Sequence, residues 1–228
     1  MLGETEWMAV TLSVQVSLWA TVISLPVAIG VAYVLARRDF RGHAVLNALV
    51  HAPLVLPPVV TGYLLLLLFS RNGPAGQVLQ DWFGVTLAFR WTGAVLAAAI
   101  MAFPLMVRAI RLGFEAVDPK LEQAAKTLGA GPLVVFGTVT LPLIFPGILA
   151  GVVLAFAKAM GEFGATITFV SNIPGQTQTI PSAIYSAMQV PGQEPVAMTL
   201  VLISAGIAVG ALIVSEILAR RMQRRLAA

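Results

Sequence analysis

The stretch VDPKLEQAAKTLGA, residues 117–130, has the clearest helical pattern among the polar parts of this 228-residue chain. Asp118 is a favourable N-cap, and Pro119 suits the first helical position because no helical hydrogen bond needs its missing N–H. Apolar side chains recur at helical spacing, and Gly129 supplies a C-terminal stop. The sequence therefore predicts a short amphipathic helix at about residues 118–130, lying between two hydrophobic segments and available for contact with another protein.

Composition indicates an integral membrane protein. Hydrophobic residues make up 58% of the chain and charged residues only 11%, whereas soluble domains carry about 25% charged residues. The mean hydropathy is +0.90, and the apolar residues form long uninterrupted runs that a soluble core does not need. The chain has no cysteine, which excludes disulfide scaffolds, thiolate metal sites and cysteine catalysis. The predicted fold class is all-α and membrane-embedded.

Five apolar runs are long enough to cross a bilayer, for which about 20 residues are needed. They cover about residues 8–36, 48–69, 91–112, 141–170 and 196–218. The second run contains Pro53, Pro57 and Pro58, which remove backbone donors and kink a helix. No convincing repeat relates the two halves, so we predict a single transmembrane domain over residues 1–228.

The basic residues predict the orientation of the chain. Three Lys or Arg follow the first run, four follow the third and four lie in the tail, which together account for 11 of the 14. Cytoplasmic segments carry such an excess, so we expect the N-terminus outside and the C-terminus inside. This places residues 118–130 in the cytoplasm. The same reading explains the basic pI near 10 without a nucleic-acid partner.

Lys158 and Glu162 are the most informative charges within the predicted spans, because each is costly inside a bilayer. Their i, i+4 spacing allows them to pair on one helix face. One interpretation is an ion pair that fixes helix packing, and the other is a charged element that lines a pathway or gate. Gly161 and Gly164 flank the site and permit close helix approach or local unwinding.

Three hydroxyl residues follow this site and could accompany an oxyanion, namely Thr166, Thr168 and Ser171. Hydroxyls on helices more often bond to their own backbone, so this feature alone is a weak signal.

No catalytic constellation is evident in the sequence. The Gly-x-Ser-x-Gly, His-Glu-x-x-His and Walker A patterns are missing, and His43 and His51 have no carboxylate cluster beside them. We therefore predict no catalytic residue, no metal site and no cofactor in this chain. It cannot hydrolyse ATP by itself, so any energy for its work comes from another subunit.

The opening stretch resembles a cytoplasmic pattern of bacterial ABC importer permeases. That pattern reads Glu-Ala-Ala, three residues, Gly, nine residues, Ile, one residue, Leu-Pro. The matching positions here are Ala124, Ala125, Gly129, Val139, Leu141 and Pro142, while Gln123 takes the place of the glutamate and Glu122 precedes it. The resemblance implies that these residues, Glu122 and Gln123 included, couple the permease to an ATPase.

Almost the whole chain is similar to the permease subunits of molybdate ABC importers, most clearly in residues 51–60, 103–111 and 161–185. This resemblance implies a type I importer fold in the bacterial inner membrane and transport of molybdate, and of tungstate, by alternating access. It also implies a second copy of the chain, an ATPase dimer that binds ATP and magnesium, a periplasmic molybdate-binding protein and surrounding lipid. Alternatives are a sulfate or thiosulfate permease and, from other classes, a membrane enzyme or a passive channel.

Overall fold

The computed structural model describes residues 3–226, with side chains described for all of them except 215 and 219–226. The four tail arginines counted above (Arg220, Arg221, Arg224 and Arg225) therefore lie outside the described side chains. The longest helices are α1 (Glu4–Arg37), α5 (Trp91–Ala116), α8 (Leu141–Met160) and α11 (Glu194–Leu226). Shorter helices connect them: α2 (His43–Val55), α3 (Pro58–Phe69), α4 (Pro74–Phe83), α6 (Pro119–Thr127), α7 (Pro132–Val135), the π-helix η1 (Phe136–Thr140), α9 (Gly164–Val170) and α10 (Ile180–Met188).

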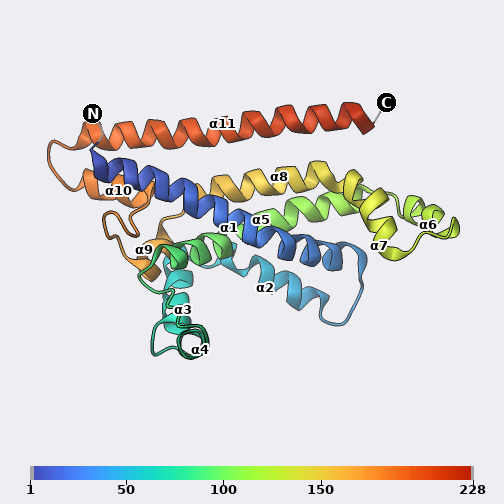
Figure 1. The fold of residues 1–228 in the computed structure, drawn as a ribbon, viewed down its shortest axis with the longest axis horizontal. Coiled ribbons are helices and arrows are strands. Elements are labelled where there is room, and N and C mark those ends of the chain that lie inside the picture. The colour runs from blue at the N-terminus through green and yellow to red at the C-terminus, as the bar shows by residue number, and fades with distance from the viewer. Residues whose placement is uncertain (1–2, 227–228) are drawn as a thin grey trace.

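The core is the packed trio of α1, α5 and α8, which run alongside one another in Figure 1. Small residues make this packing close: the buried face of α1 carries alanine, serine and threonine, and that of α5 carries alanine. At the α5–α8 crossing, Gly113 and Gly147 face each other, and a Cβ added at Gly147 would lie 3.0 Å from the Cα of Gly113. In lipid, where apolar burial gives no drive between helices, such close contact stabilises the bundle.

The chain between residues 43 and 69 forms two helices, where the sequence suggested one kinked span over 48–69. α2 and α3 meet at an angle of 112°. Leu56 and Pro57 each precede a proline, which disfavours the helical backbone, and both are extended with ψ of 140° and 135°. Pro58 then occupies the first position of α3. The paired prolines therefore break this segment rather than bend it.

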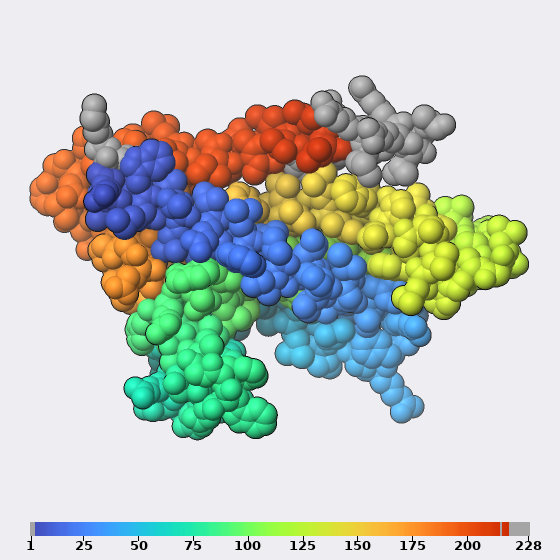
Figure 2. All heavy atoms as spheres, viewed as in Figure 1, coloured from blue at the N-terminus to red at the C-terminus, as the bar shows by residue number. Residues whose placement is uncertain are grey.

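The α3–α4 arm projects from the bundle as a result, and a notch separates it from α2 in the space-filling view of Figure 2. α3 remains attached through its contact with α9. The apolar run expected at 141–170 is also interrupted, because α8 ends at Met160 and α9 begins only at Gly164.

The arrangement of the ends agrees with an odd number of membrane crossings. α1 begins at one end of the bundle, whereas α11 finishes at the other end, which is also where α6 lies (Figure 1). Among the described residues, four helical segments are long and apolar enough to span a membrane, or five if the bent α2–α3 pair is one span. The predicted all-helical membrane fold is therefore confirmed.

A buried contact joins the beginning of the chain to its last third. The backbone N–H of Ile180, at the start of α10, donates to the Ser13 hydroxyl of α1 at 2.7 Å. α10 is further capped by Thr179 and Ser182, which bond reciprocally to each other's backbone groups. This contact fixes the loop after α9 against the first helix.

Candidate functional site

The predicted amphipathic helix is α6, which has a defined beginning and end. The Asp118 carboxylate accepts the Lys120 backbone N–H at 2.9 Å, as an N-cap does. At the other end, Ala130 N–H donates to Ala125 O and Gly129 N–H donates to Lys126 O. These two bonds form a Schellman motif, whose C′ position needs a left-handed backbone. Gly129 supplies it, with φ of +85°.

Glu122 ties α6 to the rest of the protein. Its Oε1 accepts from Arg37 Nη2 at 3.3 Å and from the Thr140 hydroxyl at 3.0 Å. Arg37 Nη2 also donates to the Val117 carbonyl at 3.1 Å. Both charged side chains are largely buried, with 15% and 16% of their side-chain surface exposed. Three segments distant in sequence (the end of α1, the start of α6 and the end of η1) are thereby held together.

The π-helix η1, which contacts α6, leads directly into Leu141 and Pro142. Pro142 has no N–H to donate to the carbonyl of Thr138, so a regular α-helical turn cannot close there. The Leu141 N–H donates instead to Phe136 O, five residues back, in a wider turn. Leu141 and Pro142 then start α8, which continues into the core. The Thr140–Glu122 hydrogen bond therefore joins α6 to the segment that leads into α8.

The outer surface of this elbow, which we define as α6, α7 and residues 128–131, is exposed and apolar at its tip. Leu128 and Leu133 are 89% and 87% exposed, and Leu121 is half exposed. Gln123 and Ala124 also face outward, while Ala125 is half-buried. Leu128 and Leu133 are therefore available for contact with another molecule at the tip of the elbow.

Lys158 and Glu162 lie at the break between α8 and α9. Lys158 Nζ donates to Glu162 Oε2 at 2.7 Å, and the Ala165 backbone N–H donates to Glu162 Oε1 at 3.0 Å. Glu162 is 3% exposed, whereas the Lys158 side chain is 30% exposed. The carboxylate thus links the last turn of α8 to the first turn of α9 across Gly161.

Two glycines let α9 pack directly against α3. A Cβ on Gly62 would lie 2.5 Å from the Ala165 carbonyl oxygen, and one on Gly164 would lie 2.7 Å from Pro58 Cβ. No larger residue fits at either position without displacement of backbone. The two broken segments of the chain, at residues 56–57 and 161–163, are therefore joined at one place.

The predicted hydroxyl residues lie on or beside α9. Thr166 donates to the Glu162 and Phe163 carbonyls and Thr168 donates to the Gly164 carbonyl, so both hydroxyls engage their own backbone. Ser171 ends α9 with φ of +67° and is exposed. The two histidines are also engaged locally: His43 Nε2 lies 3.0 Å from Leu35 O, and His51 Nδ1 lies 2.8 Å from Asn47 O.

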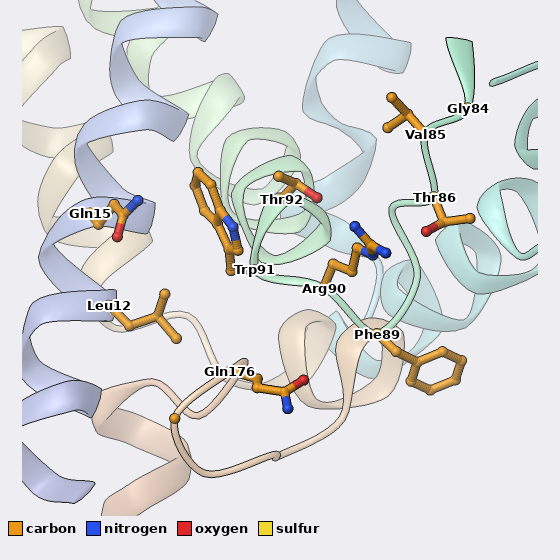
Figure 3. A pocket seen from close by; sticks show the side chains of 11 residues that line it. Leu12, Gln15, Gly84, Val85, Thr86, Phe89, Arg90, Trp91, Thr92 and Gln176 are labelled. Carbon is orange, nitrogen blue, oxygen red and sulfur yellow. The ribbon is translucent and has the colours of Figure 1, made fainter. Parts of the chain in front are cut away.

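Sequence reasoning missed Arg37 and Thr140, the two partners of Glu122. Arg37 belongs to a basic cluster whose presence is already accounted for by the predicted membrane orientation, so it did not suggest an ion pair. It also lies 85 residues from Glu122 in the sequence. A polar cavity at the opposite end of the bundle was also missed (Figure 3). No motif marks that cavity, because its residues come from α1, the loop before α5 and the loop after α9.

Comparison with known proteins identifies the class. A family model for the inner membrane component of binding-protein-dependent transport systems matches residues 24–226. The chain belongs to this family. Such a component works with an ATPase and a substrate-binding protein, so this chain is a transport subunit and not the ATP-hydrolysing one.

Curated relatives are similar over nearly the full length. The molybdenum transport system permease protein ModB of Escherichia coli (strain K12) is 59% identical over 224 residues, 98% of both chains. ModB of Haemophilus influenzae (strain ATCC 51907) is 54% identical over 221 residues, 97% of this chain and 96% of that one. The predicted resemblance to molybdate ABC permeases is confirmed and is favoured over the sulfate alternative.

Solved structures share the fold at low sequence identity. A bacterial ABC transporter that imports the acidic polysaccharide alginate has a TM-score of 0.75 at 16% identity, covering 96% of this chain and 80% of that one. The inward-facing MetNI methionine ABC transporter has a TM-score of 0.70 at 13% identity, covering 95% and 94%. These neighbours support the importer-permease fold.

Proposed function

We propose that this chain is the transmembrane subunit of an ATP-driven importer for molybdate, and for tungstate, in the bacterial inner membrane. The observation that carries the proposal is the 59% identity to a molybdenum transport permease over 98% of both chains. The working assembly contains two copies of the chain, a dimer of ATPase subunits and a periplasmic molybdate-binding protein. ATP and magnesium are held by the ATPase.

The elbow is the part that meets the ATPase in this proposal. Its exposed leucines offer apolar contact, and Gln123, Ala124 and Ala125 lie on the same short helix. Closure of the ATPase dimer moves α6, and the Glu122–Arg37–Thr140 contacts pass that movement to α1 and α8. The helices then switch as rigid bodies between inward-facing and outward-facing arrangements.

The break at Gly161 is the gate element in this proposal. Lys158 and Glu162 connect α8 and α9 on either side of it, and α9 carries α3 with it through the glycine contacts. Thr166 and Thr168 keep their hydroxyls on backbone carbonyls, so their role is to shape α9 rather than to bind the anion. Ser171, exposed at the end of α9, is the hydroxyl left to face the pathway.

Reconstitution in liposomes tests the proposed function. The permease, its ATPase and the binding protein are expected to hydrolyse ATP faster when molybdate is present and to accumulate it inside. Uptake should resist a hundredfold excess of sulfate. Equal inhibition by sulfate would favour the sulfate permease, and uptake without ATP would indicate a passive channel.

Glu122 and Gln123 are expected to have separable roles. Glu122→Ala removes the acceptor of two hydrogen bonds, one of them from a charged donor, and should destabilise the permease by about 1.5–3 kcal/mol even without its ATPase. Gln123→Ala removes only an exposed amide and should leave stability unchanged while weakening ATPase binding. Thermal unfolding of the isolated permease, together with co-purification of the ATPase, measures both effects.

Glu122→Gln is the matched control, because its amide oxygen can still accept from Arg37 and Thr140. The unfolding temperature of the Glu122→Gln protein should lie closer to that of the original protein than the unfolding temperature of Glu122→Ala does. Equal unfolding temperatures for Glu122→Ala and the original protein would show that the carboxylate does not hold α6 in place.

A further inference from the structure

A polar cavity lies at the end of the bundle opposite the elbow. Its volume is about 730 Å³, and its wall includes Gln15 of α1, Arg90 and Thr92 at the start of α5, and Gln176 of the loop after α9. Figure 3 shows these side chains around a common space, with the Trp91 ring between Gln15 and Arg90. Within the described residues, the Arg90 guanidinium forms no ion pair or hydrogen bond with another side chain or carbonyl.

An apolar cavity adjoins the polar one. Trp91 and Thr92 also line a second cavity of about 410 Å³, which is otherwise walled by apolar side chains such as Trp19 and Leu96. That cavity in turn shares Ile23, Leu96 and Ala99 with a third one of about 530 Å³. The three hollows therefore lie next to one another in a row, which we call the groove; it begins at Arg90, follows α1 and α5, and reaches α2 at its far end.

The length of the groove matches one leaflet of a membrane. From Thr92 to Phe103, the last α5 residue in its wall, eleven residues along α5 span about 16 Å at 1.5 Å per residue. The hydrocarbon core of a bilayer is about 30 Å thick, so a leaflet contributes about 15 Å. An acyl chain that starts at the interface would fill the groove without reaching the other leaflet.

The start of the groove suits a phosphate group. Arg90 provides a guanidinium, which binds phosphate oxygens through paired donors. Thr92 adds a buried hydroxyl that has no hydrogen-bond partner among the described residues. α5 begins here, and its N-terminal dipole also favours an anion. The cationic and hydrogen-bonding groups thus stand at one end of a groove whose remainder is apolar.

We infer that this groove is a binding site for one membrane phospholipid, with its phosphate at Arg90 and Thr92 and an acyl chain along Ile23, Leu96 and Ala99. A free oxyanion would use the polar cavity alone and would leave the apolar part without an occupant. The adjacency of the polar and apolar cavities and the match to one leaflet favour a lipid. This inference does not depend on which anion the importer carries.

Native mass spectrometry of the full chain, purified with its ATPase and given dioleoyl phosphatidylglycerol, tests the site. Arg90→Gln is expected to weaken lipid binding about tenfold, which corresponds to about 1.4 kcal/mol. Arg71→Gln, at the other arginine of this end, should change it less than twofold. Ala99→Phe adds bulk to the wall shared by the two apolar cavities and should also weaken binding about tenfold, whereas Ala205→Phe, on an exposed face of α11, should not.

Three results would overturn the inference. The first is equal lipid binding by the Arg90→Gln and Arg71→Gln proteins. The second is binding of soluble glycerol phosphate as tightly as the lipid with no effect of Ala99→Phe, which would indicate a site for free oxyanions. The third is loss of the dimer in Ala99→Phe but not in Ala205→Phe, which would show that a second copy of the chain covers the groove.

Discussion

Gly129→Val is expected to uncouple ATP hydrolysis from transport, lowering the number of molybdate ions moved per ATP by about tenfold. Gly129 holds φ of +85° at the stop of α6, and a side chain makes that backbone unfavourable by about 1–2 kcal/mol. A β-branched residue is among the least tolerant there. A Cβ at this position would meet no atom within 4 Å, so the effect would come from backbone conformation and not from a clash.

Gly131→Val is the matched control for this change. Gly131 lies two residues further on with equally open surroundings, but its φ of −68° and ψ of 161° are readily adopted by valine. Gly129→Asn should largely preserve coupling, because asparagine tolerates the left-handed region. Simultaneous measurement of ATP hydrolysis and molybdate uptake in proteoliposomes gives the number of molybdate ions transported per ATP hydrolysed. Similar ratios for Gly129→Val and Gly131→Val would contradict a role for this turn in coupling.

Lys158→Met is expected to destabilise the permease by about 3 kcal/mol and to abolish most transport. It leaves the Glu162 carboxylate, 3% exposed, with only the Ala165 N–H as a donor, and an unpaired buried charge is strongly destabilising. Glu162→Gln should be milder, because the amide oxygen can still accept from Ala165 and Lys158 is exposed enough to reach water. The double change should recover much of the stability lost in Lys158→Met, so the effects of the two single changes should not add.

Arg111 and Glu115 provide the comparison for this pair. They have the same i, i+4 spacing and the same 2.7 Å contact, but both side chains are exposed, at 29% and 41%. Glu115→Gln removes this exposed ion pair and leaves the hydrogen bond from Arg111 to Asn47 in place, so it should alter stability by only about 0.5 kcal/mol. The stability of each variant is measured by unfolding it in detergent and monitoring the loss of its helical circular-dichroism signal. If the double change at 158 and 162 equals the sum of the single ones, the two residues do not act as a pair.

The elbow was the most predictable part of the molecule, because its signals are local. An aspartate before a proline and a glycine after the last helical turn identify both ends of α6 from fewer than fifteen residues. The partner of Glu122 was not predictable in the same way. Arg37 is 85 residues away, and nothing in the spacing of either residue distinguishes a buried ion pair from an ordinary interfacial arginine.

The broken segments were predictable only in part. Pro57 and Pro58 indicate a kink, but the 112° angle between α2 and α3 depends on where α9 lies. That position depends on Gly62 and Gly164, whose need for space becomes visible only when α3 and α9 are placed together. Hydropathy also merges residues 141–170 into one run, because most of the residues around the break at 161–163 are apolar or small and the break leaves no gap in the apolar composition.

The bond between Ser13 and Ile180 has a consequence for the order of synthesis. The hydroxyl of Ser13 enters the membrane with the first helix, yet the amide that it pairs with is 167 residues later in the chain. At about 5–20 residues per second, the ribosome needs roughly 10–30 s to supply that amide. For this interval the nascent permease holds its first helix without one of its native contacts, so the final seating of that helix waits for the last third of the chain.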